Sequence, residues 1–208
     1  MANKATSIFV GAGLLALGVF LVMKRKTLST LATSALDEAN REIFLAVTPS
    51  AVAPYYDVIK QVAEEQGVDP FVIAALGWQE SGWTTRSPYT PLGDPCGTGD
   101  AGHGHGIMQI DDGTWSSWLA SNDWCDPMVN VTKGAQIFRD NLDRALAAGL
   151  TGDFAVQAAI GAYNHGGKSI TNAVQGLSPD AGLPNPNYSS TVWNLVSSWS
   201  DSFSSMIA

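Results

Sequence analysis

The chain has 208 residues, which is enough for one domain whose core is stable without bound metal or several disulfides. Its hydrophobic content of 45% excludes a disordered chain over most of the length, although the charged fraction of 14% is low for a soluble protein. The net charge of −8 disfavours a nucleic-acid partner, because proteins that bind phosphate backbones gather Lys and Arg on one face.

An apolar stretch lies near the N-terminus. Residues 5–23 contain no charged side chain and are bracketed by Lys4 and the basic triplet at 24–26. At about 1.5 Å per residue, a helix of this length just spans a hydrocarbon layer of roughly 30 Å. We therefore expect residues 1–26 to form a transmembrane anchor with a basic flank. A cleavable signal peptide is the alternative, but its basic residues would precede the apolar run.

The segment after the anchor changes in composition. Residues 27–52 mix Leu, Ala, Ser and Thr with charged side chains, and they are expected to form a helical stalk or linker. Pro49 and Pro54 interrupt this pattern, which places the domain boundary between them. The remaining chain, 53–208, is expected to be a single domain.

Two helices are predicted at the start of this domain. The first covers 55–66, with apolar residues at helical spacing and Gly67 as its C-terminal stop. Asp69 as N-cap and Pro70 in the first turn then open the second helix. This second helix carries Glu80 near its C-terminal end.

The middle of the chain has loop character. Residues 84–112 are crowded with Gly, Pro, Asp and Thr, which predicts a loop or a short hairpin. Cys96 lies in this stretch and Cys125 lies in later loop-like sequence. A disulfide between them would add about 3 kcal/mol by loop closure and would favour an oxidising compartment. Two unpaired thiols are the alternative.

Three further helices are expected toward the C-terminus. Residues 130–150 and 154–163 show helical periodicity, with Asp153 expected to cap the second helix. A closing helix is expected from an apolar stripe of Val192, Val196, Trp199 and Phe203. Packing on the domain is the favoured interpretation of this stripe, and a membrane-surface helix is disfavoured because its polar face is rich in Ser rather than in basic residues. The predicted fold class is mainly α.

Glu80 is the candidate for acid–base chemistry. A carboxyl side chain that donates a proton to a leaving group near neutral pH must still be protonated when substrate arrives. A helix C-terminus places partial negative charge near Glu80, and Trp78 and Trp83 are expected to restrict water there; both effects raise the pKa of a carboxyl group. A solvated Glu at a helix end is the alternative, and the motifs that follow along the chain argue against it.

Three sequence blocks carry a family resemblance. They are Glu80-Ser81, then Gly-Ile-Met-Gln-Ile at 106–110, then Ala-Tyr-Asn at 162–164. In this order they resemble the signature blocks of soluble lytic transglycosylases and goose-type lysozymes, over about residues 55–176. The glycine-rich run 99–111 is similar to the goose-type branch in particular. The resemblance implies a mainly α, lysozyme-like domain that cleaves the β-1,4 bond between N-acetylmuramic acid and N-acetylglucosamine in peptidoglycan, without metal or organic cofactor.

The resemblance also implies roles for matching residues. Glu80 would be the general acid and later the base, and Ser81 would orient its carboxyl group or a substrate carbonyl. Backbone and amide groups of the second block would bind the N-acetyl sugars, while the third block would line the cleft beside the cut bond. The implied substrate-binding residues are Ser81, Met108, Gln109, Ile110, Tyr163 and Asn164.

Asp100 and Asp111 bear on the finer mechanism. In the goose-type pattern, acidic residues at these places would position a water molecule for hydrolysis, as a second carboxylate does in inverting glycosidases. Lytic transglycosylases instead let the muramoyl hydroxyl attack its own anomeric carbon, which leaves an anhydro end and needs no second carboxylate. Cleavage to the anhydro product is the favoured prediction, and goose-type hydrolysis is the alternative. Asp beside Gly is also common turn chemistry.

His103 and His105 invite a metal hypothesis. With one further His, at position 165, and no fixed helical spacing among the three, a zinc site is disfavoured. Sugar contacts or plain loop residues are the favoured interpretations.

The expected location follows from the anchor. Under the positive-inside rule, the basic triplet at 24–26 leaves the C-terminal bulk on the cytoplasmic side. This fits a bacteriophage protein that is carried in a virion membrane, or stored until infection, better than an enzyme of the bacterial inner membrane facing the wall. A non-catalytic peptidoglycan-binding anchor and a structural protein with accidental motif matches are the other function classes, and the sequence does not indicate an oligomeric state.

Overall fold

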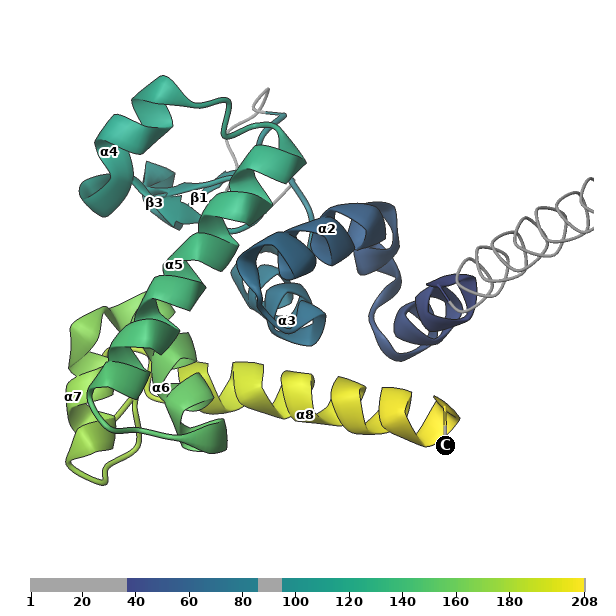
Figure 1. The fold of residues 1–208 in the computed structure, drawn as a ribbon. Helices are drawn as coiled ribbons and strands as arrows, with labels where there is room; N and C mark the ends of the chain where they lie inside the picture. Colours follow the sequence, from purple (N-terminus) through teal and green to yellow (C-terminus); the bar gives the residue numbers. More distant parts are fainter. Residues whose placement is uncertain (1–36, 86–94, 208) are drawn as a thin grey trace, which may run out of the picture. The chain divides into compact units, whose positions relative to one another are not determined.

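The computed structural model describes residues 37–85 and 95–207 (Figure 1). The chain divides into two compact units, Met1–Ile43 and Phe44–Ala208. In the first unit the described residues, 37–43, are helical. The predicted anchor at 5–23 lies outside the described residues. Among the residues that are described, no helix is both long enough and apolar enough to cross a membrane.

The second unit is mainly helical, which confirms the predicted fold class. Its helices are η1 (Ser50–Tyr55), α2 (Tyr56–Gln66), α3 (Pro70–Ser81), η2 (Asp100–Gly102), α4 (Asp112–Ser121), α5 (Pro127–Ala147), α6 (Gly152–His165), α7 (Gly167–Val174) and α8 (Tyr188–Ile207). In Figure 1, α5 runs from the small sheet at one end to α6 and α7 at the other, and it also packs on α2 and α3. Helix α8 packs on α3 and α6. The helices thus surround α3, which carries Glu80.

Local capping chemistry sets the bounds of α2 and α3 where the sequence predicts them. Gly67 ends α2 in the left-handed conformation, with φ of 61°, which favours glycine. The Asp69 carboxylate accepts a hydrogen bond from the Phe71 N–H at 2.8 Å, and Pro70 occupies the first turn of α3. From Phe71 to Gly77 every residue of α3 is buried, so this helix is the centre of the core.

The compact unit reaches back to Phe44, before the expected boundary at residue 53. The Phe44 ring stacks on Phe71 at 4.9 Å and meets Tyr56 edge-on at 5.3 Å. Val52 is also fully buried. The C-terminal part of the segment expected to be a stalk, 27–52, therefore packs into the core of the domain.

The glycine-rich stretch forms a small sheet, in agreement with the predicted short hairpin. Three two-residue strands pair antiparallel in the order β1 (Thr98–Gly99), β2 (Gly104–His105) and β3 (Ile110–Asp111). Gly99 pairs with Gly104, and Gly104 pairs with Asp111 on its other side. Helix α4 follows directly and was not predicted, because its Trp and Ser residues form no buried stripe.

A disulfide joins Cys96, just before β1, to Cys125 in the loop between α4 and α5. It closes a loop with a sequence separation of 29 residues.

By loop-closure entropy we expect reduction of this disulfide to lower the free energy of unfolding by roughly 3–4 kcal/mol. Urea unfolding with and without reductant measures this difference, and the double variant Cys96→Ser/Cys125→Ser should be insensitive to reductant. An equal response of wild type and double variant would contradict the prediction.

The C-terminal helices agree with the prediction except at two points. Val192, Val196 and Trp199 are buried on α8, so the apolar stripe packs on the domain as expected. The expected cap of α6 by Asp153 is wrong, because Thr151 is the N-cap residue and Asp153 lies inside the first turn. Helix α7 was not predicted; it is short and begins immediately after α6.

Candidate active site

A cleft of about 560 Å³ lies between the small sheet, α4, α5 and α6. One wall is the sheet with the start of α4, the other is the C-terminal end of α6 with the loop that precedes α8. Its lining includes seven of the predicted site residues, which are Glu80, Asp100, Gln109, Ile110, Asp111, Tyr163 and Asn164. The three blocks that are far apart in the sequence therefore meet at one cavity.

Glu80 lies in the last turn of α3, and its carboxyl group is desolvated although the residue still borders the cleft. Burial is the largest effect on this group and raises its pKa. A hydrogen bond from the Tyr188 hydroxyl, which Oε1 of Glu80 accepts, opposes that rise, and the negative charge of Asp100 adds to it. The net result raises the pKa of Glu80 to about 7. The carboxyl group can thus be protonated near neutral pH.

Tyr188 was not identified from the sequence. It is the first residue of α8, and its side chain is buried. Burial and the nearby Glu80 carboxylate raise the pKa of its phenol well above the ordinary value, so Tyr188 keeps its proton and acts as a donor. The sequence contains only a weak signal for it: Tyr188 begins a helix whose apolar stripe is expected to pack on the domain.

Tyr163 lies near Glu80 and braces the cleft wall. Its hydroxyl donates a hydrogen bond to the Met108 carbonyl at 2.8 Å. Burial, and then the Glu80 charge, raise the pKa of this phenol well above its ordinary value. Asn164 follows on the exposed side of the cleft lining. The predicted placement of both residues beside Glu80 agrees with the structure.

The second block shapes the cleft through its own internal bonds. Gln109 Nε2 donates to the carbonyls of Gly97 (3.1 Å) and Gly106 (2.7 Å). A Cβ atom at Gly99 or Gly104 would lie 2.1 or 2.4 Å from Gln109 Oε1, so both strands need glycine to accommodate this amide. The Gln109 amide N–H groups are therefore engaged within the loop and not free for sugars, in contrast to the expectation from the sequence.

Met108 and Ile110 also have structural roles. Both side chains are buried in the core, and a Cβ atom on Gly134 of α5 would lie 2.7 Å from the Met108 methyl. The Met108 N–H donates to Asn130 Oδ1 at 2.8 Å, and its carbonyl accepts from Tyr163. Both backbone polar groups of Met108 are thus used inside the protein.

Asn130, which the sequence did not single out, ties α5 to this block. Its side chain is buried, accepts a hydrogen bond from the Met108 N–H and donates one from Nδ2 to the His105 carbonyl at 3.0 Å.

Asn130→Ala should lower the free energy of unfolding by about 2–3 kcal/mol, because it leaves buried backbone groups without partners. Urea unfolding measures this, with Asn122→Ala in exposed sequence as the control. Equal small losses in the two variants would contradict the bridging role.

One comparison decides the family. A model of the Transglycosylase SLT domain matches residues 57–178, which is more than half of the chain. This chain belongs to the transglycosylase SLT domain family. Members of the family are lytic transglycosylases that act on peptidoglycan, so the protein is an enzyme with that substrate. The matched range contains Glu80 and the whole second and third blocks, but it ends before Tyr188.

Ser81 of this transglycosylase takes a different position from the one that the resemblance implied. Its hydroxyl donates to the Gly77 carbonyl of the same helix at 3.2 Å and is absent from the cleft lining. A hydroxyl that bonds back to the preceding turn is held away from the Glu80 carboxyl group. The hydroxyl that donates a hydrogen bond to the Glu80 carboxyl group is that of Tyr188.

The tryptophans near Glu80 do not form the expected shield. Trp83 is buried on the core side, where its Nε1–H donates to the Ala74 carbonyl at 2.7 Å and its ring lies against Gly77. Trp78 is 37% exposed, and neither ring lines the cleft. The expectation that they restrict water is therefore wrong.

The two candidate acids differ in their surroundings. Asp111 is the N-cap of α4, and its Oδ2 accepts from the N–H (2.8 Å) and the hydroxyl (2.7 Å) of Thr114. Asp111 therefore has the structural role, capping the turn that begins α4, that is common for Asp beside Gly. Asp100 is exposed on the cleft wall, and its charge contributes to the raised pKa of Glu80. Of the two, Asp100 is the acid whose charge acts on Glu80.

His103 and His105 both lie near Asp112. His103 Nδ1 lies 2.9 Å from Asp112 Oδ1, and this contact raises the pKa of the exposed imidazole and lowers that of the carboxyl group. His105 packs edge-on against Trp124 at 4.8 Å between ring centres. Over residues 37–85 and 95–207, no three His, Cys, Asp or Glu side chains are grouped to hold a metal ion.

Proposed function

We propose that Glu80 of this lytic transglycosylase is the general acid, and then the base, for cleavage of the β-1,4 bond between N-acetylmuramic acid and N-acetylglucosamine. The observation that carries the proposal is a carboxyl group with a pKa of about 7 at the cleft. Near neutral pH a protonated fraction of Glu80 donates its proton to the glycosidic oxygen as the C–O bond breaks. The resulting carboxylate then takes the proton of the muramoyl 6-hydroxyl, whose oxygen bonds to the anomeric carbon and closes the anhydro ring.

The surrounding groups support this assignment. Tyr188 donates to one oxygen of the Glu80 carboxylate, which stabilises the charged form that arises after proton transfer. Trp115 lines the cleft from α4, and Lys133 Nζ lies 3.3 Å from the centre of its ring. A fixed aromatic side chain among amide and carboxylate groups suits sugars, which present both apolar faces and hydroxyls.

Goose-type hydrolysis is the second candidate, and Asp100 is the observation in its favour. This exposed carboxylate shares the cleft with Glu80 and could orient a water molecule toward the anomeric carbon. Mass spectrometry of wall digested to completion distinguishes the two reactions. Transglycosylation predicts anhydromuramoyl ends, whereas products with reducing ends alone would end the first proposal.

A further part of the proposal concerns location. Residues 5–23 would anchor the enzyme in a virion membrane or the bacterial inner membrane, for bacteriophage entry or local opening of the wall. The uncharged stretch between Lys4 and the basic triplet supports this. Carbonate extraction of membranes from producing cells tests it: full-length chain should stay with the membrane, and a chain starting at residue 37 should not. Release of both would contradict the anchor.

A further inference from the structure

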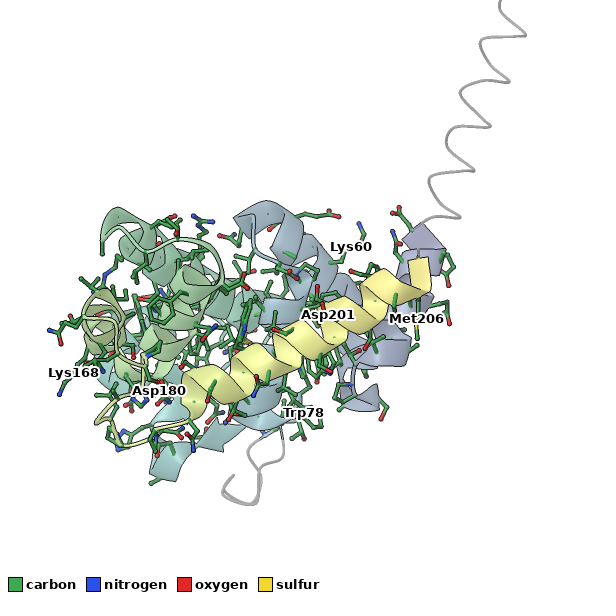
Figure 2. The ribbon with its side chains drawn as sticks, turned by 90° about the horizontal axis from the view of Figure 1, so that it is seen from below. Lys60, Trp78, Lys168, Asp180, Asp201 and Met206 are labelled. Carbon is green, nitrogen blue, oxygen red and sulfur yellow. A yellow bond between two sulfur atoms is a disulfide. The ribbon has the colours of Figure 1, made fainter. Side chains whose placement is uncertain are left out.

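Asp180 is a buried acid that the proposed reaction does not use. It lies in the loop between α7 and α8 and has no exposed surface. Its Oδ2 accepts two hydrogen bonds from Ser189, one from the backbone N–H at 2.8 Å and one from the hydroxyl at 2.6 Å. Figure 2 shows Asp180 beside the first turn of α8, the helix drawn in yellow. Removing a carboxylate from water is costly, so favourable interactions inside the protein must offset this cost at Asp180.

The carboxylate meets the positive end of α8. The first N–H groups of a helix have no partner within the helix, and negative charge is favoured there. Ser189 directly follows Tyr188, so the two bonds fix the turn from which Tyr188 reaches Glu80.

His165 completes this arrangement from α6. Its Nε2 donates to the Asn185 carbonyl at 3.2 Å and lies 3.9 Å from Asp180 Oδ1. The His165 ring also packs edge-on against the Tyr188 ring, with 6.2 Å between the ring centres. Asp180 Oδ1 has no hydrogen-bond partner among the described residues. Two contacts therefore hold Tyr188 in place. Its ring packs against His165, and the first turn of α8, to which it belongs, is bonded to Asp180 through Ser189.

We propose that Asp180 is a positioning residue for the cleavage reaction: it fixes the first turn of α8 so that the Tyr188 hydroxyl stays on Glu80. The inference rests on the proposed role of Glu80. Asp180 acts through Tyr188 and not on Glu80 directly, because the groups that shift the Glu80 pKa are Tyr188 and Asp100, whereas Asp180 acts on Tyr188.

A double-mutant cycle tests this dependence. Asp180→Ala should lower kcat about tenfold when Tyr188 is present and less than about twofold in the Tyr188→Phe background, because residues that act as one unit are not additive. Asp180→Asn, which keeps an acceptor for Ser189, should restore most of the rate. Asp201→Asn, at an exposed acid of α8, is the control and should change nothing. Equal factors in the two backgrounds would overturn the proposal.

Two further readouts keep the test decisive. If Asp180→Ala does not fold, Ser189→Ala removes one of the two bonds and should lower kcat about threefold, again only with Tyr188 present. The alkaline limb of the pH–rate profile should move to higher pH in Asp180→Ala and in Tyr188→Phe, since both lose the bond that lowers the Glu80 pKa. An unmoved limb in the Asp180 variant would overturn the proposal. Full activity of Glu80→Gln would instead refute the role of Glu80 itself.

A second inference concerns an extension of the cleft. A neighbouring hollow of about 450 Å³ shares Trp115, Ile137, Asn141 and Arg144 with the cleft at Glu80, so the two adjoin. The acids lining the cleft at Glu80 are Glu80, Asp100 and Asp111, those lining the hollow are Asp140 and Asp143, and Arg144 lies where the two meet. Among the described residues that line the cleft and the hollow, Arg144 is the one with a basic side chain.

The Arg144 guanidinium is held in place but not neutralised. Its Nη1 donates to Oδ1 of the buried Asn141 at 3.3 Å, and a Cβ atom on Gly167 of α7 would lie 2.6 Å from its Nη2. The nearby Asp143 pairs instead with Arg139. Within the described part of the chain, Arg144 makes no ion pair.

We infer that Arg144 binds a carboxylate of the peptide that muramic acid carries in peptidoglycan, a conclusion that also rests on the proposed site at Glu80. The N-acetylated sugars themselves are neutral, so the peptide supplies the anion. A planar guanidinium pairs with a carboxylate through two parallel hydrogen bonds. The enzyme should therefore prefer glycan strands that still bear peptides.

Matched substrates test this preference. Arg144→Gln should lower kcat/KM at least about tenfold on peptide-bearing wall, because the hydrogen bonds between the guanidinium and the peptide carboxylate are lost. Cleavage of peptide-free glycan strands should be unchanged, because these strands carry no such carboxylate. Lys60→Gln is the control, because Lys60 pairs with Glu64 on α2 and lines neither the cleft nor the hollow. Equal losses on both substrates, or no loss on either, would overturn the inference. Glu80→Gln should lose both activities, which separates failure of this inference from failure of the proposed site.

Discussion

Replacing Glu80 with Gln is expected to remove wall cleavage while the fold remains intact. The amide keeps the size of the carboxyl group and can still accept the bond from Tyr188, but it has no acidic proton to donate to the leaving oxygen. General acid–base catalysis typically contributes about 10²- to 10⁴-fold, and we expect a loss of that order. Zymography in a wall-containing gel and clearing of purified wall measure the loss, and circular dichroism checks the fold.

Glu65→Gln is the matched control for this experiment. Glu65 is exposed on α2 and bonds to Gln61 one turn earlier, so its substitution should leave cleavage unchanged. If Glu80→Gln cleared wall as fast as wild type, Glu80 would not be the acid. Loss of clearing in both variants would point to a damaged fold rather than to missing chemistry.

The sequence predicted the features of this fold that depend on local chemistry. Gly67 and the pair Asp69-Pro70 set the ends of α2 and α3 through backbone conformation and capping, which need no knowledge of the tertiary structure. The position of Glu80 in the last turn of α3 then follows from the length of this helix. The stripe on α8 was recognisable because one of its faces is apolar and the other is rich in Ser.

Features that depend on tertiary packing were not predictable. Tyr188 reaches Glu80 across 108 positions of sequence, because α8 packs on α3. The orientation of Trp83 was equally hidden, because this residue follows the C-cap of α3 and its ring turns back onto Gly77 of that helix. Whether the Gln109 amide meets substrate or its own loop depends on the missing Cβ atoms at Gly99 and Gly104.

The raised pKa of Glu80 predicts how activity depends on pH. The donor must be protonated, so activity should be half lost near pH 7 and should fall about tenfold for each further pH unit. The alkaline limb of kcat/KM, measured on purified wall, reports this pKa for the free enzyme. A limb near the ordinary glutamate value of 4.5 would mean that the carboxyl group is solvated.

Stability provides a second measure of the same pKa without any substrate. The Glu80 pKa rises from 4.5 in the unfolded chain to about 7 in the folded protein, so the associated stability is fully present below pH 4.5 and is lost as pH rises to 7. The loss is at most about 3 kcal/mol, because each pKa unit corresponds to about 1.4 kcal/mol and Glu80 keeps some contact with solvent.

Comparison with Glu80→Gln isolates this contribution, because the other titrating groups are common to both proteins. The amide stays neutral, so the free energy of unfolding of the variant should gain on that of wild type between pH 4.5 and pH 7 and hold a constant lead above pH 7. Urea unfolding at a series of pH values measures the difference. A difference that does not change with pH would show that folding leaves the Glu80 pKa unaltered, and the burial that supports its role as acid would then be absent.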